Sequence, residues 1–175
     1  MNQRTTRAIA VLMATLAYMA IPVLATDSGP QQAVIKGTLG GEEMSWQLQT
    51  DQRVPSAVFT SLTPGTHQIH INAYSSERYL REGSIELTLL IADGEVRSAE
   101  ILFFPFPRLY PRFSFGSDHG TGTVSIDSLT FDANHARLSA RFEGELYYHQ
   151  SVNTRPISQR TRAASLQFDL TAVRE

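Results

Sequence analysis

Apolar and polar residues alternate along most of this chain, and this period of two limits its fold more than any other feature. The alternation is clearest over residues 69–73, 85–91, 138–148 and 166–172, and no stretch keeps a helical period. Successive side chains of a strand point to opposite faces, so this pattern predicts half-buried strands. The Asp93-Gly94 pair between two such runs indicates a tight hairpin, because Asp and Gly tolerate the positive φ that it requires.

Turn residues separate about nine predicted strands at intervals of roughly 8–14 residues, a layout typical of all-β proteins. We therefore expect an all-β, single-domain antiparallel β-sandwich. A closed up-and-down β-barrel is the alternative. The sandwich is favoured because the predicted strands are uneven in length and the first three are short.

The N-terminus has the pattern of an export signal. Arg4 and Arg7 precede an uncharged apolar run over residues 8–21, and Pro22 and Ala25 follow it. This run is shorter than the roughly 20 residues of a spanning helix, which favours a cleavable secretory signal peptide over residues 1–25. Residues 26–32 are then a flexible leader and residues 33–175 the all-β domain. The expected location is the bacterial periplasm or the cell exterior.

Composition excludes several classes of function. The chain has no cysteine, which rules out disulfides, thiol catalysis and thiolate metal sites. Its formal net charge of −2 argues against a specific nucleic-acid binder, which is usually strongly basic.

Motifs of catalysis are also missing from the sequence. It contains no H-E-x-x-H, no G-x-S-x-G and no phosphate-binding Gly-Lys loop. His67 and His70 would face opposite sides of a regular strand, which excludes a shared metal ion. We expect no enzyme activity, catalytic residue, metal or cofactor. A hydrolase using Asp118 and His119 is a remote alternative, because a neighbouring carboxylate can orient an imidazole.

The segment 102–115 combines aromatic residues, prolines and arginines. If the strands from residue 66 onward run antiparallel, then loops 75–83, 105–121 and 150–162 lie at one end of the domain. These loops hold seven arginines and three acidic residues, which predicts a basic, aromatic loop end. The candidate ligand-binding residues are Arg78, Arg81, Arg108, Tyr110, Arg112, Arg155, Arg160 and Arg162.

The sequence thus predicts an exported, non-enzymatic binding or interaction module with an anionic partner. The partner would be a polysaccharide, a lipid headgroup or an acidic protein surface. The alternative is a barrel that carries a lipid or a small apolar molecule in a cavity. Its lining would include Trp46, Phe59, Phe142 and Tyr148.

Overall fold

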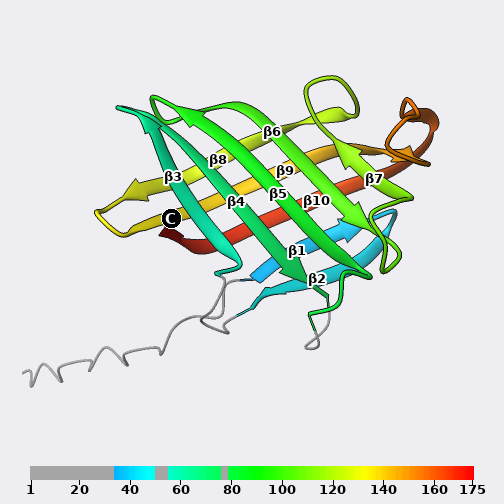
Figure 1. Cartoon of the computed structure of the whole chain (residues 1–175), viewed down its shortest axis with the longest axis horizontal. Coiled ribbons are helices and arrows are strands. Elements are labelled where there is room, and N and C mark those ends of the chain that lie inside the picture. Colours follow the sequence, from blue (N-terminus) through cyan, green and yellow to red (C-terminus); the bar gives the residue numbers. More distant parts are fainter. Residues whose placement is uncertain (1–33, 50–54, 76–78) are drawn as a thin grey trace, which may run out of the picture. The chain divides into compact units, whose positions relative to one another are not determined.

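Ten β-strands make up most of the chain that the computed structural model describes, namely residues 34–49, 55–75 and 79–175 (Figure 1). The strands are β1 (Val34–Leu39), β2 (Glu42–Leu48), β3 (Ala57–Thr63), β4 (Thr66–Tyr74), β5 (Ser84–Ala92), β6 (Glu95–Phe104), β7 (Arg112–Phe115), β8 (Thr121–Phe131), β9 (His135–His149) and β10 (Ile157–Arg174). The all-β prediction is confirmed. The described residues include no helix that could cross a membrane. The predicted signal peptide, leader and residue 33 lie outside the described residues.

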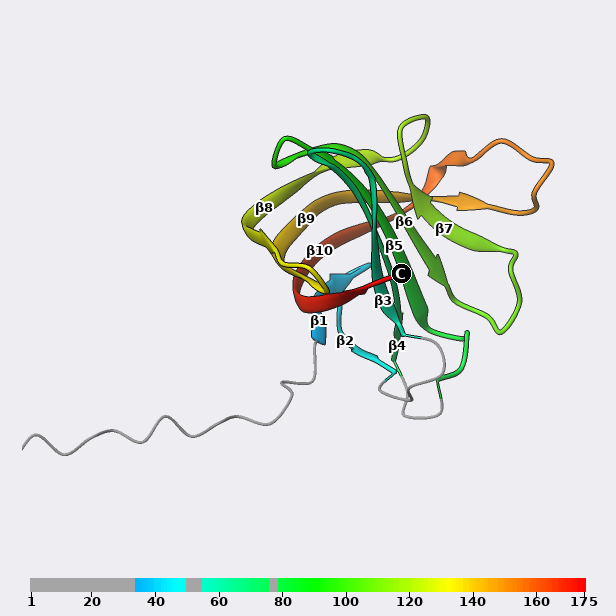
Figure 2. The same cartoon turned by 60° about the vertical axis from the view of Figure 1, so that its left-hand side comes forward.

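All ten strands belong to one mixed sheet whose hydrogen bonding returns on itself. The long strand β10 pairs with β9 along one edge, and with β1 and β3 along the other. From β3 the pairing continues through β4, β5, β6 and β7 back to β9. The pairing of β3 with β10 is parallel. The result is a ring-like sheet in which the layer of β3 to β6 crosses the layer of β8 to β10 (Figures 1 and 2). The two layers of the expected sandwich are therefore joined by hydrogen bonds.

The interior of the ring is filled by the apolar side chains of the alternating pattern. Every second residue of β5 is buried, and so is every second residue of β9 except Gly144, as the sequence predicts. The largest fully buried side chains include Trp46, Phe59, Phe142 and Phe168. Three of the four side chains predicted to line a carrier cavity, Trp46, Phe59 and Phe142, belong to this contiguous core. The carrier alternative stays a prediction.

Two strands extend into segments that the sequence analysis assigns to loops. Strand β7 lies within the predicted connection 105–121, and β10 begins at Ile157, inside the predicted loop 150–162. Strand β7 has only four residues and follows three prolines, so its alternation is too short to predict a strand. The first part of β10 carries polar residues on both faces. Both segments are strands because β9 pairs with them.

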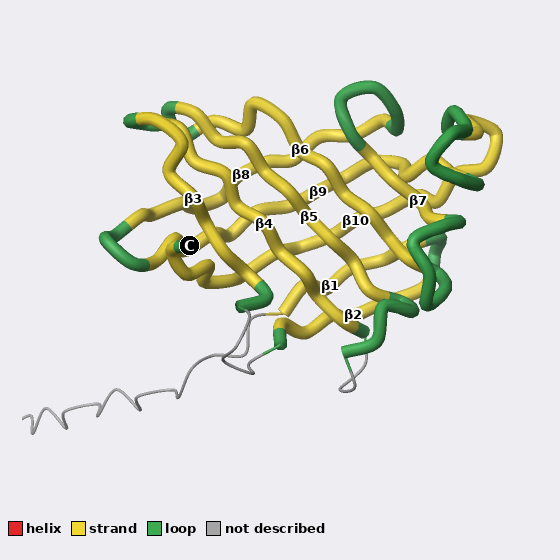
Figure 3. Tube along the Cα trace, viewed as in Figure 1, coloured by secondary structure: helices red, strands yellow, loops and turns green. Residues whose placement is uncertain are grey.

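Strands β7 and β8 form one line along the same edge of β9, interrupted by residues 116–120. Strand β7 pairs with residues 147–149 of β9, and β8 continues from residue 145 to residue 136. Strand β6 pairs with β7 through residues 101–103. Strand β7 thus lies between β6 and β9, and the segment 116–120 leaves the sheet at the end of β7. Loops gather at this end of the ring (Figure 3).

Candidate functional site

Strand β7 presents aromatic rings to the inside of the ring and polar groups to the outside. Phe113 and Phe115 pack against the core. Because side chains alternate along a strand, Arg112 and Ser114 lie on the opposite face. Two different clusters therefore form on the two sides of β7.

The inner cluster, here called the mouth cluster, consists of Phe103, Phe113, Tyr148, Arg160 and Arg162. Phe113 is the register partner of Phe103 on β6 and of Tyr148 on β9. The Cζ atom of Arg162 lies 4.9 Å from the ring centre of Phe113 and 5.6 Å from that of Phe103. The Cζ atom of Arg160 lies 3.7 Å from the ring centre of Tyr148. The rings close the end of the core, and the two guanidinium groups cover them.

Three further arginines of the predicted site also lie over aromatic rings. Arg81 lies over Phe104 at 4.7 Å, and its Nη1 atom is 3.2 Å from Glu86 Oε1. The other two contacts lie within the segment 105–112. They are Arg108 over Phe106 at 5.7 Å and Arg112 over Tyr110 at 4.7 Å.

One further predicted arginine makes none of these ring contacts. Arg155 is exposed in the turn between β9 and β10, and it has no ring contact with the described residues. Arg78 lies outside the described residues.

Carboxylates neutralise the arginines of the loop end only in part. Within the described ranges, Arg108, Arg112, Arg155, Arg160 and Arg162 form no ion pair. Elsewhere on the ring, arginines do pair with acids. Arg97 binds Glu95 at 3.0 Å, and Arg141 binds Asp127 through two nitrogens. The guanidinium groups of the loop end therefore keep donors available for an external anion.

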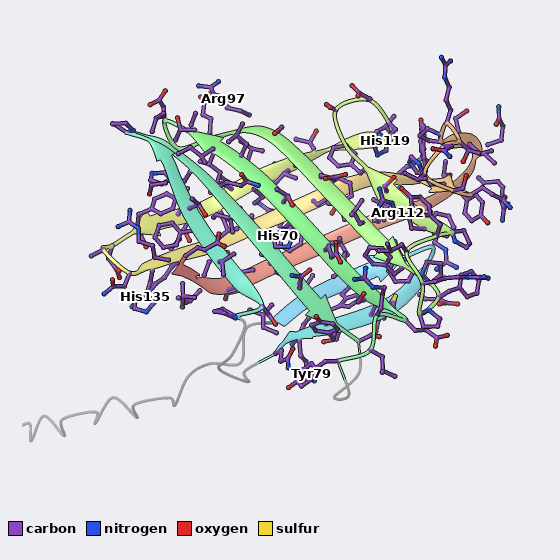
Figure 4. All side chains as sticks on the ribbon, viewed as in Figure 1. His70, Tyr79, Arg97, Arg112, His119 and His135 are labelled. Carbon is purple, nitrogen blue, oxygen red and sulfur yellow. The ribbon has the colours of Figure 1, made fainter. Side chains whose placement is uncertain are left out.

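The outer cluster consists of Arg112, Ser114, His119 and His149 (Arg112 and His119 are labelled in Figure 4). Arg112 and His149 are register partners across β7 and β9. The segment 116–120 folds back through hydrogen bonds between the backbones of Gly116 and His119. This fold brings the His119 ring to the His149 ring, with centres 4.9 Å apart and planes at 75°.

Burial lowers the pKa of both imidazoles of the outer cluster below the ordinary histidine value. Burial, with His119 and Arg112, lowers the pKa of His149 to about 4. Burial also lowers the pKa of His119, aided by Arg112 and opposed by Glu100 and Asp118. Two neutral imidazoles thus stand next to a permanent guanidinium charge.

The proposed pair of Asp118 and His119 does not form a hydrogen bond within the described structure. Asp118 is exposed and accepts a hydrogen bond from Ser117 at 3.4 Å. The ring of His119 packs on His149 instead. Among the described residues no group of three His, Asp or Glu side chains could hold a metal ion.

Sequence reasoning missed His149 and Ser114 as members of a cluster. His149 ends a strand, and Ser114 lies in the segment predicted to be a connection. Their meeting depends on the pairing of β7 with β9, which joins residues far apart in the sequence. The alternation of Arg112, Phe113, Ser114 and Phe115 is the only local signal, and it is too short to fix a partner.

Fold and site define this chain as a ring-like all-β protein with an arginine-rich, aromatic loop end. Comparison with known proteins finds no family, no characterised sequence and no solved structure that matches the chain.

Proposed function

We propose that this protein is an exported, non-enzymatic binding module whose loop end binds an anionic partner. The observation that carries the proposal is the mouth cluster, where Arg160 and Arg162 lie on aromatic rings and have no carboxylate partner in the described structure. A guanidinium stacked on a ring keeps its edge N–H donors free for a carboxylate, sulfate or phosphate group. The ring contacts also hold the side chains in place, which reduces the entropy lost on binding.

Export supports the proposal from the sequence. The signal pattern of residues 1–25 would deliver the chain to the periplasm or the cell exterior. Polysaccharides, lipid headgroups and acidic protein surfaces all present anionic groups there. The five arginines of the loop end that form no ion pair with the described residues would concentrate such partners, although the whole chain carries a net charge of −2.

The first test measures retention of the purified protein on heparin and on anionic vesicles across a salt series at neutral pH. We expect retention at low salt that falls as salt screens the charges. The double variant R160Q/R162Q should bind at least about tenfold more weakly, the effect of losing roughly 1.4 kcal/mol of attraction.

The matched control is the double variant R97Q/R137Q, which makes the same change of charge. Arg97 lies next to the turn between β5 and β6, and Arg137 is an exposed residue of β9 near its turn with β8. This control should keep the retention of the unchanged protein. Equal binding by both double variants would refute a site at the mouth cluster.

A further inference from the structure

All buried side-chain nitrogen and oxygen atoms without a hydrogen-bond partner in the described part of the chain belong to the outer cluster. They are Arg112 Nε, Ser114 Oγ, His119 Nε2 and His149 Nε2. Most buried polar atoms in folded proteins are hydrogen-bonded, so four unpartnered buried atoms in one small cluster require an explanation. Ser114 is a clear case, because its side chain is fully buried.

The local backbone holds these four groups together. Strand β7 places Arg112 and Ser114 on the same face, and its pairing with β9 sets His149 opposite Arg112. The segment 116–120 then lays the His119 ring over this face. Gly116 permits the approach, since a Cβ atom there would lie 3.1 Å from Cε1 of His119. The four groups come from β7, β9 and one short loop.

The net charge of the outer cluster and its acidic neighbours changes sign when the two histidines take up protons. Arg112 on β7 is permanently positive, while Glu100 on β6 and Asp118 in the loop are negative and close enough to affect His119. With both imidazoles neutral, the five groups carry a net charge of −1. With both protonated, they carry +1. Proton uptake therefore converts a surface that repels anions into one that attracts them.

We propose that the outer cluster is a binding site for a tetrahedral oxyanion, of the sulfate or phosphate type, taken up together with protons. An N–H of Arg112, the hydroxyl of Ser114 and the Nε2–H groups of two imidazolium rings supply four donors. An oxyanion accepts from all four. A metal cation does not suit the site, because the guanidinium of Arg112 repels it and the described residues offer no third ligand.

The pH dependence of the site follows from linkage. In the ion-free protein the pKa of His149 is lowered to about 4, and the pKa of His119 is lowered as well. A bound anion favours the charged imidazoles and must raise both pKa values. By reciprocity, the affinity for the anion increases as the pH falls from the ordinary histidine range toward about 4.

Sulfate is the appropriate probe, because its charge stays constant over this range of pH. The full protein is titrated with sodium sulfate at fixed ionic strength, at about pH 7, 5 and 4, values that run from above the ordinary histidine pKa down to the lowered pKa of His149. The imidazole nitrogens are followed by NMR, and circular dichroism verifies the fold at each pH. We expect an affinity at least about tenfold higher at the lowest pH, and a rise of the His149 pKa by at least about one unit with sulfate.

Variants identify the residues responsible. H119Q and H149Q should each reduce the pH dependence of sulfate binding, because each variant removes one of the two imidazoles that take up a proton with the anion. S114A, a smaller change, should weaken binding at low pH and leave the fold intact. H135Q is the matched control, because His135 is an exposed histidine that lies beside Asp132 in the turn between β8 and β9. H135Q should bind sulfate as the unchanged protein does.

Three results would overturn the proposal. The first is a sulfate response in H119Q and H149Q that equals that of the unchanged protein. The others are a His149 pKa that does not change when sulfate binds, and stronger binding of planar acetate than of sulfate or phosphate. Binding of Zn²⁺ to both histidines at neutral pH, with no sulfate response, would assign a metal site instead. Heparin retention is measured at neutral pH, where the histidines are neutral, so the loop-end proposal and this one can fail separately.

Discussion

Replacement of Trp46 by alanine is expected to lower the free energy of unfolding by about 3–5 kcal/mol, the usual cost of removing a large buried aromatic side chain. Trp46 on β2 is fully buried inside the ring. Its indole N–H also donates to the carbonyl oxygen of Gly83 at 2.7 Å. The side chain thus fills the core and fixes the segment that leads into β5.

The variant W46F separates these two contributions. Phenylalanine keeps most of the apolar surface but leaves the carbonyl of Gly83 without its donor, so we expect a loss of about 1–2 kcal/mol. Trp46 is the single tryptophan of the chain, so urea unfolding must be followed by circular dichroism. L62A is the control, because Leu62 is 51% exposed and should change the stability by no more than about 0.5 kcal/mol. A W46A protein as stable as the control would show that Trp46 does not stabilise the ring.

The inner face of the ring could be predicted from the sequence because each strand carries its own signal. The apolar positions of residues 85–91 and 138–148 are the buried positions of β5 and β9. The closing of the sheet could not be predicted. It depends on two register pairs between β3 and β10, Val58 with Val173 and Phe59 with Arg174. Alternation specifies which face of a strand is buried but not which strand lies beside it.

The loop end shows the same division between local and distant information. The aromatic residues, prolines and arginines of segment 102–115 indicated an unusual surface. Five of the predicted arginines do lie over aromatic rings. Which arginine covers which ring could not be predicted, because Arg162 reaches Phe103 and Phe113 across strand pairings. The outer cluster could not be predicted from the sequence for the same reason. Its histidines are 30 residues apart in the sequence and meet only after β7 pairs with β9.

Gly37 is the position where the ring tolerates a side chain least. It lies opposite Leu166 of β10, and a Cβ atom there would overlap the carbonyl oxygen of Ser165. The same Cβ would lie 2.9 Å from Cα of Leu166. Both obstacles are backbone atoms, which cannot rotate away as a side chain can. Strands β1 and β10 approach each other closely here because residue 37 is glycine.

We therefore expect G37A to lower the free energy of unfolding by about 2–3 kcal/mol, in the upper range for overpacked positions. K36A, at the neighbouring exposed residue, should change it by no more than about 0.5 kcal/mol. Amide hydrogen exchange would show which strands lose stability in this variant. The amide of Gly40, which follows β1 and donates to the carbonyl of Ala163 on β10 at 2.7 Å, should lose protection together with the amides of β1.

The amides between β5 and β6 should stay protected in G37A, because these strands pair with each other on the opposite layer. Such a result would show that β1 and β2, which lie between β10 and β4, can open while β10 keeps the ring closed through β3. A uniform loss of protection in all strands would show instead that the ring unfolds as one unit. Full protection at Gly40, with unchanged stability, would contradict the close approach of β1 to β10.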